Sequence, residues 1–204
     1  MKIGTLLTRL LLLAGSIATA GCDSDLGITG VHSPEPGILR IYLKSADSDS
    51  MIVIAGDTVK VGEGANDFLG LTIAQGRAHA DDNFAVLFKR LDEYLELSET
   101  YNMIAQENGM YVEFLIFETY LPPATYDSLR IVINAQSLLL GTFQIPIVTP
   151  PDIGPIATFV QRFSINENRI TEVRLQLKPF KSLQRRGDAY HFFRDIEVSG
   201  IINL

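Results

Sequence analysis

The stretch RITEVRLQLK, residues 169–178, alternates apolar and polar side chains with a period of two. Val173, Leu175 and Leu177 fall on one face of an extended chain, while Arg174 and Gln176 fall on the other. Such alternation is typical of a β-strand that packs one face against a core and turns the other to water. The stretch therefore predicts a half-buried strand.

Similar segments recur from Gly37 onward, separated by Gly, Pro, Asn and Asp. About ten short strands at this spacing favour two packed sheets over alternating strands and helices. We therefore expect an all-β fold, with a single antiparallel β-sandwich over residues 37–204. One helix is expected around Ser98 to Glu107, where Ser98 could cap the first turn, although residues 91–97 could equally begin it. The expected strands are 37–44, 51–61, 68–79, 84–97, 111–119, 125–134, 137–148, 156–165, 170–177 and 190–201.

Length and charge limit the classes of protein to which the chain can belong. A chain of 204 residues, 47% of them hydrophobic, can bury one sizeable core. Without Lys2 and Arg9 the 17 basic residues fall to 15, against 24 acidic ones, which leaves a net charge of −9. An acidic surface repels phosphate, so nucleic acid is not expected as a partner. The single cysteine, Cys22, excludes a disulfide within the monomer and a cysteine-rich zinc site.

The first residues have the composition of an export signal. Lys2 and Arg9 supply the positive charge, and residues 10–18 form an apolar segment too short to span a bilayer as a helix. The next four residues, Thr19-Ala20-Gly21-Cys22, resemble the lipobox of bacterial lipoproteins, in which small residues precede a cysteine that is lipidated and becomes the new N-terminus. The resemblance implies a signal peptide over residues 1–21 and a lipid on Cys22.

The tail that follows is suited to a tether. Residues 22–36 are rich in Asp, Ser, Gly and Pro, as expected for a flexible spacer between a lipid and a domain. Two or three acyl chains would give stable anchoring where one is marginal. A competing site exists, because Ala18-Thr19-Ala20 fits ordinary signal peptidase, and cleavage between Ala20 and Gly21 would release a soluble protein. The sequence does not distinguish the inner from the outer membrane.

A proline-rich segment in the second half carries a family resemblance. LPPATY, residues 121–126, followed by LRI, residues 129–131, resembles the L-P-x-G-x-Y-x-x-I-R-L segment of the DUF4382 family of bacterial, often lipid-anchored envelope domains. The resemblance implies a β-sandwich of immunoglobulin-like or transthyretin-like character, and it implies no enzyme activity. It spans about residues 37–201, with further matches at 37–43, 146–156, 163–165, 175–177, Ser182 and Tyr190.

Candidate metal ligands are scattered. His32, His79 and His191 lie far apart without the spacing of a metal motif, so no metal site or cofactor is expected, and His79 and His191 are interpreted as strand-face residues. Residues 47–50 and 81–83 offer oxygen ligands that calcium would accept. Neither cluster continues into a calcium-binding loop, and Asp and Asn favour turns by bonding their own backbone, so local turn formation is the preferred interpretation.

One basic stretch stands out in this acidic chain. Lys178, Lys181, Arg185 and Arg186 lie between Phe180 and the turn residues Gly187-Asp188. We interpret the stretch first as an exposed hairpin loop and second as a contact for an anionic partner, such as lipid headgroups or polysaccharide.

These observations lead to one expected function and two alternatives. We expect a membrane-anchored envelope lipoprotein, exported to the periplasm or the cell surface, whose β-sandwich is a non-enzymatic structural or binding module. Its partner would be an envelope protein or a glycan, bound through loops and exposed strand edges. One alternative is a carbohydrate- or calcium-binding adhesin domain. The other is a hydrolase whose site is assembled from scattered residues.

Overall fold

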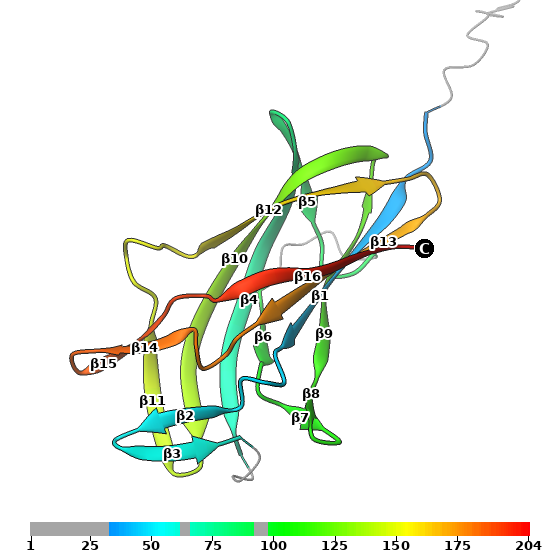
Figure 1. The fold of residues 1–204 in the computed structure, drawn as a ribbon. Coiled ribbons are helices and arrows are strands. Elements are labelled where there is room, and N and C mark those ends of the chain that lie inside the picture. The colour runs from blue at the N-terminus through cyan, green and yellow to red at the C-terminus, as the bar shows by residue number, and fades with distance from the viewer. Residues whose placement is uncertain (1–32, 62–65, 92–97) are drawn as a thin grey trace, which may run out of the picture. The chain divides into compact units, whose positions relative to one another are not determined.

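The structure is a computed structural model that describes residues 33–61, 66–91 and 98–204, and Figure 1 shows the strands of the unit Pro34–Leu204. The described residues contain no helix, so the expected all-β fold is confirmed. Among these residues no helix is long and apolar enough to span a membrane. In chain order the strands are β1 Gly37–Ser45, β2 Met51–Ile54, β3 Asp57–Lys60, β4 Phe68–Ala80, β5 Asn83–Leu87, β6 Glu99–Asn102, β7 Gln106–Glu107, β8 Met110–Tyr111, β9 Glu113–Leu121, β10 Ala124–Leu140, β11 Phe143–Val148, β12 Ile156–Ile165, β13 Ile170–Leu177, β14 Leu183–Arg186, β15 Ala189–Phe192 and β16 Ile196–Asn203.

Two sheets form the sandwich. The small sheet has the order β16-β13-β1-β9, and in Figure 1 it crosses in front of the long strands β4 and β10. The large sheet has the order β14-β15-β11-β10-β4-β5, with β12 also pairing with β10 and β6 with β4. Most pairs are antiparallel, but β1–β13 and β11–β15 are parallel, which the sequence did not predict. Parallel neighbours need a long connection, and in both pairs other strands supply it.

The core lies between the two sheets and follows from the alternation in the sequence. Leu39, Ile41 and Leu43 of β1 are fully buried, as are Ile131 and Ile133 of β10. All five belong to one hydrophobic cluster. Burying side chains of this size contributes about 2 kcal/mol each, so the alternating faces of these strands hold the sandwich together.

Bulges in the long strands change which residues face the core. In β4, Ile73 pairs with Ile133 and Gly76 pairs with Ile131, so Ala74 and Gln75 together oppose one residue of β10. The extra residue reverses the alternation: Ile73 points inward before the bulge, and Gly76 and Ala78 point inward after it. Gly76 is required there, because a Cβ at this position would lie 2.8 Å from the ring of Phe117.

The turn between β9 and β10 is fastened by a buried tyrosine. The Tyr126 hydroxyl donates a hydrogen bond to the Pro122 carbonyl oxygen at 3.1 Å, four residues upstream, and the ring stacks on Phe163 with 5.4 Å between centroids. This is the arrangement of a tyrosine corner, found where a sandwich strand turns from one sheet to the other. It gives a structural role to the LPPATY segment.

Several expectations about elements were wrong. The strand expected over residues 84–97 ends at Leu87, and the one expected over residues 190–201 is divided into β15 and β16. The segment expected as a helix forms β6, a turn and β7 instead. Asn102 bonds to backbone that is distant in the chain: its Oδ1 accepts from Leu69 N at 3.0 Å and its Nδ2 donates to Asp67 O at 3.0 Å. The single strand expected over residues 51–61 is a hairpin with Ala55 and Gly56 at positive φ. The break expected after Asn134 is a bulge, so β10 continues to Leu140.

Candidate ligand groove

The expected lipidation site lies outside the described residues. Cys22, the signal peptide of residues 1–21 and the tether as far as residue 32 all belong to the part of the chain that the structure does not describe.

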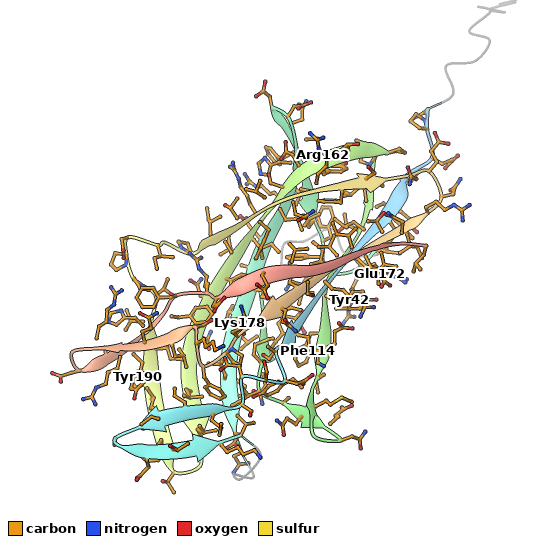
Figure 2. The ribbon with its side chains drawn as sticks, in the orientation of Figure 1. Tyr42, Phe114, Arg162, Glu172, Lys178 and Tyr190 are labelled. Carbon is orange, nitrogen blue, oxygen red and sulfur yellow. The ribbon has the colours of Figure 1, made fainter. Side chains whose placement is uncertain are left out.

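The four basic residues of the 178–186 stretch do not form one site. Lys178 lies on the small-sheet side (Figure 2), and its Nζ is 3.5 Å from Asp195 Oδ1 and 3.4 Å from Glu197 Oε2. Burial lowers the pKa of Lys178, but the attraction of these two carboxylates outweighs it and the pKa is raised. Arg185 and Arg186 belong to β14 of a β14–β15 hairpin, where the Arg186 guanidinium lies 4.2 Å from the ring centroid of Phe193.

The carboxylates of residues 47–50, for which turn formation was preferred to calcium binding, fasten segments that are distant in the chain. Asp49 is buried, and its Oδ2 accepts hydrogen bonds from the backbone N–H groups of Phe180 and Lys181 at 2.8 and 3.0 Å. Asp47 accepts from Tyr111 N at 2.9 Å and from Lys44 Nζ at 2.8 Å. The hydrogen bond from Lys44, followed by that from the Tyr111 backbone, lowers the pKa of Asp47. These acids therefore tie the loop after β1 to β8 and to the loop before β14.

The second acidic cluster makes the turn between β4 and β5. Asp81 has a φ of 50°, in the left-handed region that Asp tolerates. Its backbone N–H donates to Asp127 Oδ2 at 3.2 Å. Across the described ranges of the chain, no group of three or more His, Cys, Asp or Glu is placed so that it could hold a metal ion.

A groove on the outer face of the large sheet gathers residues that the sequence had not singled out. We call it the arginine groove. It encloses about 160 Å³, and its lining residues are Gln75, Arg77, His79, Arg130, Val132 and Ile156. Gln75, Arg77 and His79 alternate along β4 after the bulge, so all three side chains point away from the core. The bulge therefore places these three side chains on the outer face of the sheet.

Arg77 and Arg130 are direct cross-strand neighbours in the β4–β10 ladder. The row they share continues to Val86 on β5 and to Thr158 on β12, so it contains no acidic residue. Among the described residues neither arginine forms an ion pair, and like charges opposite each other in a sheet repel. The row is thus a local concentration of positive charge on an acidic protein.

Asp127, an acid whose charge interacts with Arg130, is hydrogen-bonded to its own neighbours. Its Oδ1 accepts from Ser128 Oγ at 2.7 Å, and its Oδ2 accepts from the backbone of Asp81. The hydrogen bond from Ser128 is the main reason why the pKa of Asp127 is lowered. The carboxylate serves the β4–β5 turn; its charge is also attracted to His79 and Arg130, but among the described residues it forms no ion pair with either.

His79 stands two residues from Arg77 on the same face. Its Nε2 atom is buried and has no hydrogen-bond partner within the described part of the protein. Burial, followed by the charge of Arg130, lowers the pKa of His79 below its ordinary value of 6.5. The imidazole is therefore mostly neutral near pH 7, and it lines the groove together with the two arginines.

Apolar side chains border the charged row. Val160 and Ile156 of β12 are 86% and 53% exposed, and Phe84 of β5 is 51% exposed. The Arg77 guanidinium lies 4.6 Å from the ring centroid of Phe84, which holds that side chain along the sheet surface. The groove thus combines fixed positive charge with exposed apolar surface.

Sequence reasoning missed the groove because Arg77 and Arg130 are distant in the chain. One signal was present: in the stretch Gln75 to Ala80, long polar residues alternate with Gly and Ala, so the large side chains had to be on the outer face. His79 was correctly interpreted as a strand-face residue. No protein-family model matches the chain, and neither a curated protein nor a solved structure is significantly similar to it.

Proposed function

We propose that the chain is an exported bacterial lipoprotein, held in a membrane through a lipid on Cys22, whose β-sandwich is a non-enzymatic binding module of the cell envelope. The observation that carries the proposal is the order of features before the domain. A charged and apolar segment is followed by Thr19-Ala20-Gly21-Cys22, and a polar stretch then leads to β1. This is the order that an export signal, a lipidation site and a tether require.

The start of the domain supports the role of residues 22–36 as a tether. A Cβ at Gly37 would collide with the Asn166 carbonyl oxygen and the Ile165 side chain, so β1 is packed from its first residue. Ile38 N also donates to Arg169 O at 2.9 Å. Because β1 is packed from its first residue, the domain begins there, and the segment before it is free to act as a tether.

The resemblance to DUF4382 supports the same assignment, and we include membership of that family in the proposal. The segment that carries the resemblance contains Tyr126, whose hydroxyl fastens the β9–β10 turn. A residue pattern that encodes a turn between two sheets is expected to recur among sandwiches of one family.

The binding role is supported by the arginine groove, which lies on strands and not on mobile loops. Rigid strands hold side chains in fixed positions, which suits recognition of a ligand. The partner of such a module would be an envelope protein or a glycan. The calcium-dependent alternative gains no support, because Asp47 and Asp49 already accept hydrogen bonds from Lys44 and from backbone N–H groups.

The anchoring is tested by expressing the full chain in a bacterial host with labelled palmitate. The wild type and a Ser24→Ala control are expected to carry the label and to fractionate with membranes, whereas Cys22→Ser is expected to lose both properties. Mass spectrometry of the mature N-terminus separates the two cleavage sites. An unlabelled, soluble wild type that begins at Gly21 would contradict the proposal.

A further inference from the structure

The arginine pair, Arg77 and Arg130, places like charges opposite each other in the sheet, which destabilises the pairing of β4 with β10. Arg77 and Arg130 face each other across adjacent strands, and no described acidic residue stands in their row. Repulsion in this position weakens strand pairing, and a single Glu at either position would remove it. An anionic ligand that contacts both arginines would offset this repulsion.

Two arginines that face each other across neighbouring strands define the chemistry of that ligand. Their planar donor forks match the oxygen atoms of a carboxylate, a phosphate or a sulfate, and each can donate two parallel hydrogen bonds. Arg77 is held by the Phe84 ring, so part of its conformational freedom is lost before any ligand arrives. His79 lines the same groove, and its Nε2 atom has no hydrogen-bond partner among the described residues.

The surroundings of the pair restrict the ligand further. The hollow of about 160 Å³ is large enough for one oxyanion group and a few adjoining atoms, since water occupies about 30 Å³ per molecule in the liquid. Val132 and Ile156 line the hollow together with the Gln75 amide. The part of the ligand next to the charged group therefore meets an apolar wall.

The charge of the remaining surface argues against a long polyanion. After removal of residues 1–21 the chain carries a net charge of −9, so repeated negative charges outside the groove would be repelled. A single anionic group avoids this repulsion and keeps the attraction of both arginines.

We propose that the arginine groove binds a small organic oxyanion, with its carboxylate, phosphate or sulfate group between Arg77 and Arg130 and its apolar portion against Val132 and Ile156. This site is separate from the 178–186 stretch. The proposal goes beyond lipid anchoring and does not depend on it, because its test measures ligand binding to the domain in detergent solution.

The probe is phenyl phosphate, titrated into the full chain in a neutral detergent and observed by phosphorus NMR. The wild type and the control Arg162→Gln, whose exposed side chain is labelled in Figure 2, are expected to bind alike. Arg77→Gln and Arg130→Gln are each expected to weaken binding at least about tenfold, the effect of losing one charge-assisted interaction. Both variants should keep or exceed the wild-type melting temperature, because each removes a like-charge contact.

Competition by benzoate and by phenyl sulfate shows which oxyanion is preferred, and inorganic phosphate tests the apolar wall. Weaker binding of inorganic phosphate than of phenyl phosphate supports the proposal. Equal affinity for the two would overturn the proposed contact between the ligand's apolar portion and Val132 and Ile156. Absence of phenyl phosphate binding, or equal loss of binding in Arg162→Gln and in the two groove variants, would overturn the site itself.

Discussion

The outer faces of the two sheets use their charged residues in opposite ways. On the small sheet, Arg40 Nε is 2.7 Å from Glu118 Oε1, and Arg174 lies between Glu113 at 3.1 Å and Glu172 at 3.0 Å. On the large sheet, Arg77 and Arg130 oppose each other with no ion pair among the described residues. The arginines of the small sheet therefore form ion pairs that join its strands, whereas Arg77 and Arg130 of the groove form none among the described residues.

The two faces differ in ion pairing because the strand registers bring different residues together. Across β1 and β9 the register places Arg40 opposite Glu118, and Glu172 of β13 lies beside Tyr42 of β1 (Figure 2), whose hydroxyl is 3.5 Å away. On β4 and β10 the register places the same sign of charge together. The register therefore decides which charges face each other across these two strand pairs, and a comparison of variants on the two faces can measure the consequence.

The largest effect is expected at Asp49, in the loop that extends from the small sheet. Asp49→Ala should lower the free energy of unfolding by about 3 kcal/mol, because the N–H groups of Phe180 and Lys181 lose a charged acceptor in a buried position. Urea denaturation measures the change, with the exposed Asp57→Ala as a control near zero. A loss no greater than that of the control would show that the loop carboxylate does not support the structure.

A smaller loss is expected on the small sheet itself. Glu172→Gln should lower the free energy of unfolding by about 1–2 kcal/mol, since the Glu172 side chain is 9% exposed and accepts from Arg174. Arg174 keeps its bonds to Glu113, which limits the effect. Denaturation in low and high salt would separate the Coulombic part, and exposed Glu167→Gln is the matched control. Equal stability of the two variants would remove the distinction between the faces.

On the large sheet, a charge substitution should raise the free energy of unfolding instead of lowering it. Arg130→Glu places opposite charges on β4 and β10, and it should raise the free energy of unfolding by up to about 1 kcal/mol. The same substitution at Arg162 serves as the comparison, since that residue is exposed on β12. Thermal melting checks the order of the two variants, and destabilisation by Arg130→Glu would mean that the arginine pair supports the fold.

The smallest effect concerns pH. The pKa of His79 is lowered by burial and by Arg130, so the unfolded chain binds a proton more readily than the folded one. Stability from this source is present above pH 6.5 and is lost as the pH falls towards the lower pKa of the folded state. His79→Gln should reduce this decline in melting temperature, and Arg130→Gln should reduce it in part. A decline that is the same in all three proteins would exclude His79 as its source.

The regular strands were predictable because burial follows sequence alternation. Gly37–Ser45 and Ile156–Ile165 were found within one residue of their expected limits. Prediction failed where distant contacts decide the local structure, as with Asn102, whose side chain bonds Leu69 and Asp67. It failed again at Gln136 and Ser137, where a bulge opposite Gly70 resembles a strand end. Arg77 and Arg130 could not be paired without the register, which no local pattern contains.

The bulge at Ala74–Gln75 makes the domain unequally tolerant of different kinds of genetic change. A point substitution alters one side chain, whereas the loss of a single codon here would restore regular pleating over the rest of β4. Arg77 and His79 would then turn into the interior, and Gly76 and Ala78 would turn to water. Among descendants of this gene, the length of this one strand should therefore be inherited more strictly than the identity of the residues around it.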